Sequence, residues 1–119
     1  MENFNEDLKN RTKKLAVRVI KMYAQLKKDE IIKIIGNQFI RSSTSVAANF
    51  RAACRARSTK EYYSKLCICV EEADETLFWF EILVEADIVT ENKLNDLIVE
   101  TTEILKILAS TRKRIKQKL

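Results

Sequence analysis

The chain has 119 residues, no proline, one glycine and a formal net charge of +5. This length suffices for one domain with its own core, and so few turn residues exclude a fold of many short strands. No apolar run approaches the roughly 18 residues of a membrane span, and the opening MENFNEDLKN is unlike a secretory signal. We therefore expect a single all-α domain over residues 1–119, located in the cytoplasm.

The reactive side chains argue against an enzyme. Histidine is absent, which removes the commonest general base and metal ligand and leaves no Ser–His or Cys–His pair. Carboxylate-bridged metal bundles also need Glu-x-x-His motifs. Cys54, Cys67 and Cys69 lack a C-x-x-C spacing and fit reduced, small hydrophobic side chains better than ligands. We expect no catalytic site, metal, cofactor or small-molecule substrate.

Apolar residues recur at helical spacing along the first half of the chain. The first predicted helix runs from about residue 5 to residue 26, and KKDE at 27–30 connects it to the second. The second helix begins within residues 30–38 and continues to about residue 57. Gly36 weakens its first turns by about 1 kcal/mol relative to alanine.

The second half of the chain carries clearer helix starts. STKE at 58–61 has the form of a capping box, in which Ser58 and Glu61 satisfy each other's backbone N–H groups. The third helix is predicted to run from there to about Ala86. Thr90 is a suitable N-cap for the fourth helix, which ends in RKRIKQKL. Because all connections are short, we predict an antiparallel up-down-up-down four-helix bundle.

The second predicted helix carries three strips of residues rather than two. Phe39, Val46 and Phe50 belong to an apolar strip that faces the core. A second strip is polar but small and uncharged, which lets another helix approach closely. A third strip consists of arginines. The small polar strip contains Gln38, Ser42, Ser45 and Asn49 with Ala52 and Ala56, and the arginine strip contains Arg41, Arg51 and Arg55.

The third predicted helix is apolar on two sides. Its core stripe is Tyr62, Leu66, Cys69, Ala73, Leu77, Phe80 and Val84, while Ile68, Phe78, Trp79 and Ile82 lie opposite among glutamates. Aromatic residues beside charges are typical of protein interfaces, although scattered exposed apolar residues also occur on monomers. The helix is acidic, so its carboxylates are expected to pair with the arginine strip, within one chain or between copies. The predicted subunit interface comprises Gln38, Arg41, Ser42, Ser45, Asn49, Arg51, Arg55, Glu71, Glu75, Phe78, Trp79 and Ile82.

Residues 38–83 also resemble a known family. The pattern Q-x-x-R-S-x-x-S-V-x-x-N at 38–49, then RAACRARS and EEADETLFWFEIL, is similar to small bacterial bundle proteins encoded in intervening sequences of large-subunit ribosomal RNA genes. The resemblance covers about residues 8–110 and implies a homo-oligomer, by analogy a pentameric ring, without enzymatic activity. The chain is also similar to the accessory variability protein of diversity-generating retroelements, a basic pentamer that associates with nucleic acid and a reverse transcriptase. The Glu of the N-I-A-E-G pattern common in relatives is missing here, where residues 49–53 read NFRAA.

Two basic regions indicate a non-catalytic module that binds RNA or DNA through phosphates, with no membrane partner. The alternatives are that these charges simply solvate helix faces and that the protein is a structural scaffold or adaptor without nucleic-acid binding. The arginine strip is expected to pair with carboxylates instead of phosphates. The nucleic-acid candidates are Lys9, Arg11, Lys13, Lys14, Arg18 and Lys21 in the first helix, and Arg112, Lys113, Arg114, Lys116 and Lys118 at the end.

Overall fold

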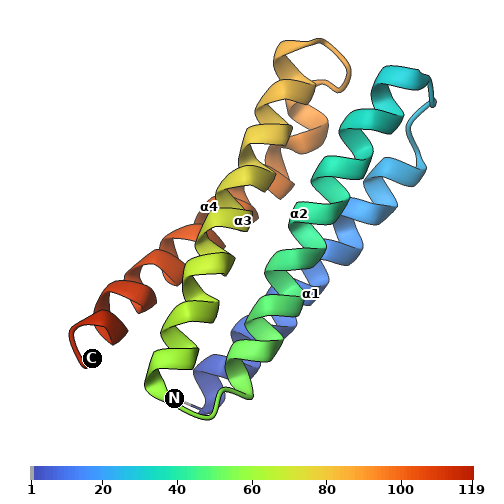
Figure 1. The fold of residues 1–119 in the computed structure, drawn as a ribbon. Helices are drawn as coiled ribbons and strands as arrows, with labels where there is room; N and C mark the ends of the chain where they lie inside the picture. The colour runs from blue at the N-terminus through green and yellow to red at the C-terminus, as the bar shows by residue number, and fades with distance from the viewer. Residues whose placement is uncertain (1) are drawn as a thin grey trace.

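The computed structural model describes residues 2–119, which form four α-helices. They are α1 (Glu2–Ala24), α2 (Glu30–Cys54), α3 (Thr59–Glu85) and α4 (Glu91–Lys116). Consecutive helices run in opposite directions and α4 returns beside α1, which gives an elongated bundle of 46 × 22 × 19 Å (Figure 1). The all-α, up-down-up-down prediction is confirmed. Within the described residues, no helix has a stretch apolar and long enough for a transmembrane span.

The helix starts follow from local capping. Asp29 accepts a hydrogen bond from the Ile32 N–H at 2.8 Å, which fixes the start of α2 ahead of Gly36. Ser58 accepts from the Glu61 N–H at 3.1 Å, so half of the predicted capping box is present. Glu61 itself lies 3.5 Å from Arg57, an ion pair in place of the reciprocal cap. Thr90 precedes α4 as predicted, but its side chain makes no cap hydrogen bond.

The core is one cluster of apolar side chains drawn from all four helices. Phe39, Phe50 and Phe80 are its largest fully buried members. In α3, Thr76 and Leu83 are buried, whereas Leu77 and Val84, which were predicted as core, are only half-buried. The reason is that α3 shares a more extensive contact with α2 than with α4, so its buried face is rotated toward α2.

Candidate nucleic-acid and subunit interfaces

Positive charge is concentrated at one end of the bundle. In Figure 1, α1 begins, α2 ends, α3 begins and α4 ends at the same, lower end. The half of the bundle formed by residues 2–13, 42–72 and 104–119 carries 14 basic and 6 acidic side chains, a net charge of +8. The opposite half carries 8 basic and 11 acidic side chains, a net charge of −3. We call the positive half the basic end.

The C-terminal cations form the densest part of the basic end. Lys113, Arg114, Lys116 and Lys118 are exposed and Arg112 is half-buried. Among residues 2–119, none of these five side chains has a carboxylate within ion-pair distance. Their positions at the negative end of the α4 dipole explain part of their local stability. Their charges are otherwise free to meet an anion from solution.

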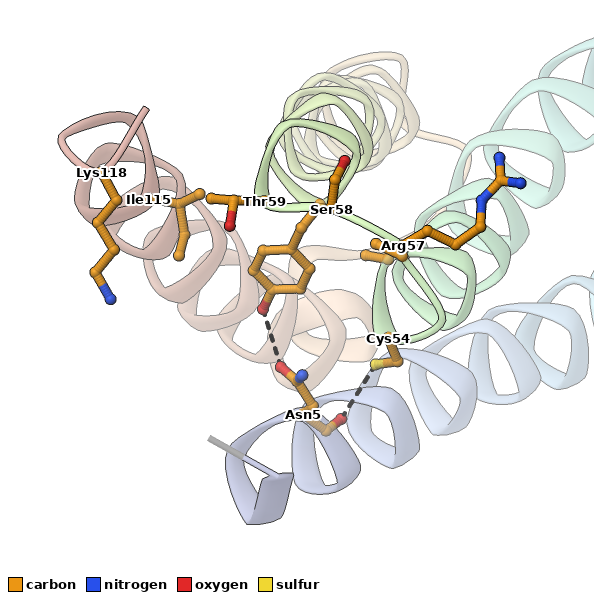
Figure 2. A pocket seen from close by; sticks show the side chains of 10 residues that line it. Asn5, Cys54, Arg57, Ser58, Thr59, Ile115 and Lys118 are labelled. Atoms are coloured by element: carbon orange, nitrogen blue, oxygen red, sulfur yellow. Dashed lines mark hydrogen bonds between the residues drawn. The ribbon is translucent and has the colours of Figure 1, made fainter.

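A hollow of about 400 Å³ opens at the same end, between the last turn of α2, the first turn of α3 and the end of α4 (Figure 2). Arg57 and Lys118 are its charged lining residues. Deeper in the hollow, the Tyr62 hydroxyl donates to Asn5 Oδ1 at 2.9 Å and the Cys54 thiol donates to the Asn5 carbonyl at 3.8 Å. Burial raises the pKa of Tyr62 and of Cys54, so both remain neutral and the hollow keeps its positive sign.

The cations of α1 do not form one patch. Arg11 pairs with two carboxylates of α4. Its Nε and a terminal nitrogen donate to the two Glu100 oxygens at 3.1 and 2.7 Å, and the same terminal nitrogen lies 3.1 Å from a Glu103 oxygen. The hydrogen bond that Arg11 donates to Glu100 is the largest cause of the raised pKa of Arg11. Arg11 therefore has a role at the α1–α4 contact, which leaves its guanidinium less available for phosphate than was predicted.

The remaining cations of α1 divide between two faces of the helix. Lys9 pairs with Glu6 at 3.0 Å and lies with the exposed Lys13 on the side toward α2. The exposed Lys14 and Lys21 share another face with the half-buried Arg18, at spacings of four and three residues.

Arg41 links α2 to the acidic helix within one chain. It donates to Glu72 at 2.8 Å and also to Glu75, which in turn accepts from the Trp79 indole N–H at 3.1 Å. The Trp79 hydrogen bond and then the Arg41 pair lower the pKa of Glu75, and Glu75 is the main cause of a raised pKa for Arg41. By contrast Arg51 and Arg55 are exposed, and neither pairs with a carboxylate in the described part of the chain.

The small polar strip is less available for contact with another subunit than predicted. Ser42 is completely buried and hydrogen-bonds Thr76, so it belongs to the α2–α3 contact and presents no surface to another subunit. Asn49 donates to the Ser45 carbonyl and hydroxyl of its own helix, both at 2.9 Å, and these two side chains and Gln38 are half-buried. At Ser42, this strip therefore packs against α3 of the same chain.

An apolar patch remains exposed on α2 and α3. Phe78 is 49 % exposed and stacks edge-on against the half-buried Trp79, with ring centroids 5.0 Å apart. Ile34, 59 % exposed, was missed by the sequence reasoning. It lies two turns before Arg41, and the half-buried Ile82 lies two turns after Glu75. Because the helices are antiparallel, the Arg41–Glu75 pair places Ile34 and Ile82 at the same level.

The thiols and carboxylates do not assemble a metal site. Within residues 2–119, no group of three or more cysteine, aspartate or glutamate side chains is arranged to hold a metal ion. Cys54 and Cys67 are half-buried and free, and burial raises the pKa of Cys69 to about 12. Glu71 is exposed and takes no part in the hydrogen bonds that join Arg41, Glu75 and Trp79.

Comparison with known proteins identifies the family. The profile of the 23S rRNA-intervening sequence proteins matches residues 5–110. The chain belongs to this family. A crystal structure of a protein of unknown function from the S23 ribosomal protein family of Bacteroides thetaiotaomicron VPI-5482 is similar to it, with a TM-score of 0.84 and 32 % sequence identity over 92 % of this chain and 97 % of that chain.

The family assignment confirms the resemblance carried by residues 38–83. Neither the 23S rRNA-intervening sequence family nor the similar structure is described as an enzyme. Comparison with the curated proteins gives no significant match.

Proposed function

We propose that the protein is a non-catalytic, self-assembling bundle that associates with RNA or DNA phosphates through its basic end. The observation that carries this proposal is the separation of charge along the bundle, +8 on one half and −3 on the other. A molecule with this charge distribution approaches a polyanion with one end first, because the field of the whole protein orients it. The unpaired C-terminal cations then replace the counterions of the nucleic acid.

The mode of contact follows from the side chains available. Lysine and arginine side chains on phosphates set position and affinity but carry no sequence information. The hollow adds the charges of Arg57 and Lys118 to the same field. We therefore propose salt-dependent binding with little preference for base sequence. Assembly of several subunits would multiply the field of each basic end.

Self-assembly is supported by the patch that a single subunit leaves uncovered. Phe78 and Ile34 are each about half exposed or more, with Trp79 and Ile82 half-buried beside them. A cluster of apolar side chains rimmed by carboxylates is typical of a protein interface. The pentameric arrangement implied by the family resemblance is the subunit count we propose.

The test of nucleic-acid association is an electrophoretic mobility shift assay with single- and double-stranded RNA and DNA of equal length, repeated from about 50 to 200 mM salt. We expect binding at low salt, with the logarithm of the association constant falling linearly with the logarithm of the salt concentration. Absence of any shift at the lowest salt, for all four nucleic acids, would overturn this part of the proposal.

The alternative is a scaffold that binds only protein. It is favoured by one observation, that Arg11 and Arg41 are held by carboxylates of the same chain and are not free for phosphate. The two functions separate in the same assay. A scaffold assembles without shifting nucleic acid at any salt concentration, whereas the proposed protein does both.

A further inference from the structure

A groove runs between α1 and α2 on the outside of the bundle, with a volume of about 530 Å³. Val17 and Ile20 of α1 form its apolar wall and are 42 % and 44 % exposed. Ala47 and Ala48 of α2 line the opposite side. Their short side chains leave space that larger side chains of a partner can fill. The groove is therefore an uncovered apolar surface distinct from the patch of Ile34, Phe78, Trp79 and Ile82 on α2 and α3.

The rim of this groove is positive. Lys13 and Arg51 line it, and both are exposed without an ion pair among the described residues. Lys9 and Glu6 also line the groove, but they form an ion pair at 3.0 Å, so their charges cancel. A partner that covers the apolar wall gains most if it carries carboxylates beside its apolar residues.

The outer face of α3 has this complementary composition. Ile68, Phe78 and Ile82 supply apolar side chains, and Glu71 and Glu85 lie on the same face at helical spacing. Both glutamates are exposed, and neither has an ion pair among residues 2–119. We call these five residues the α3 ridge.

We propose that the α3 ridge of one subunit seats in the α1–α2 groove of a second copy of the same chain. This inference rests on the proposed self-assembly and names the surfaces that make it. The two surfaces match in length, since the groove-lining segment of α1 (residues 6–20) and residues 68–82 of the α3 ridge each extend about 21 Å at 1.5 Å per residue. The basic rim of the groove then meets the free carboxylates of the ridge.

The contact is head-to-tail, because the groove and the ridge are different surfaces of one molecule. Such a contact leaves each subunit with one groove and one ridge to offer, so assembly proceeds past the dimer and ends when a ring closes or a filament forms. This property gives a test that a symmetric dimer contact would fail.

The experiment uses two single variants of the full chain, Val17→Glu in the groove and Phe78→Glu on the ridge, measured by analytical ultracentrifugation. Each adds a carboxylate at an exposed position, and each is expected to sediment as a monomer of 13.9 kDa under conditions in which the wild type assembles. Mixed together, they are expected to form a 1:1 dimer of about twice 13.9 kDa, because one intact ridge meets one intact groove.

Val99→Glu is the matched control, since Val99 of α4 is exposed and apolar but lies outside both surfaces. It should assemble like the wild type. Circular dichroism checks folding, and Ile20→Glu with Ile68→Glu repeats the test if a first variant unfolds. If the wild type assembles and either folded variant still assembles to the wild-type mass, the inference is wrong but the proposed self-assembly stands. The same holds if the mixture of the two variants stays monomeric. A monomeric wild type overturns the proposed self-assembly as well and leaves the groove to a different acidic partner.

Discussion

The hydroxyl groups of Ser42 in α2 and Thr76 in α3 hydrogen-bond each other across 2.9 Å, and neither side chain is exposed to solvent. Each hydroxyl also reaches a carbonyl of its own helix, Ser42 that of Phe39 at 3.2 Å and Thr76 that of Glu72 at 2.8 Å. These local partners let two polar side chains lie in the core without an unsatisfied group. The pair therefore joins the two helices of the most extensive contact.

Ser42→Ala and Thr76→Val should each lower the free energy of unfolding by about 1 kcal/mol, because each removes a buried hydrogen bond. The double variant should lose less than the sum, because the Ser42–Thr76 hydrogen bond is lost in each single variant and is lost only once in the double variant. Urea denaturation of all four proteins measures this coupling. Strictly additive losses would show that the two hydroxyls do not interact.

Gly36→Ala should destabilise the protein although alanine is the better helix former. The ring of Tyr23 packs against Gly36, and a Cβ there would overlap its edge. The clash should cost about 1–3 kcal/mol, more than the roughly 1 kcal/mol that helix propensity returns. Thermal unfolding measures the net effect. In a Tyr23→Leu background the same substitution should be neutral or stabilising, and an equal loss there would refute the clash.

The loss of stability at acid pH should depend on Glu75. Trp79 and Arg41 lower the pKa of Glu75 in the folded protein. Glu75 therefore contributes to the free energy of unfolding above its unfolded-state pKa, near 4.3, and this contribution is lost as the pH falls through its folded-state pKa. Glu75→Gln should remove up to about 1 kcal/mol at pH 6, a small amount because the pair is partly exposed, and almost none at pH 2. Melting temperatures across this range measure the difference. Glu85→Gln is the matched control on the same helix and should leave the profile unchanged.

Cys69 should resist thiol reagents until the protein unfolds. It is fully buried, and burial raises its pKa to about 12, so little thiolate forms at pH 8. In a Cys54→Ser, Cys67→Ser background, the rate of its reaction with a chromogenic disulfide should follow the opening of the bundle measured by hydrogen exchange. Reaction as fast as that of an unfolded peptide would contradict the packing of Cys69 against Val46.

The number, order and antiparallel packing of the helices could be predicted because apolar periodicity and short connections decide them. The rotation of α3 could not, since the pattern does not reveal that α2 is its main neighbour. Thr76 and Leu83 therefore escaped the predicted core, while Leu77 and Val84 were placed in it. Ser42 was misplaced for a related reason, because a serine that bonds its own helix can be buried like an alanine.

The candidate site could be predicted only in parts. The cations at 112–118 are visible as a run, but the position of Lys118 with Arg57 around one hollow depends on the up-and-down course of the chain. Arg11 and Lys14 look alike in sequence, yet Arg11 alone lies opposite two carboxylates of α4. The groove beside Val17 was not predicted, because its lining residues in α1 and α2 form only short apolar segments on the outer faces of the two helices.

The most direct measurement compares two triple variants of equal net charge in a nucleic-acid binding titration. Lys113→Gln, Arg114→Gln and Lys116→Gln remove three exposed cations from the basic end, whereas Lys27→Gln, Lys33→Gln and Lys93→Gln remove three exposed cations elsewhere. We predict that the first variant loses at least tenfold in affinity for single-stranded RNA at 100 mM salt and has a shallower salt dependence. The second should stay within about threefold of the wild type. Equal losses for both would show that binding follows net charge alone, and would contradict an interface at the basic end.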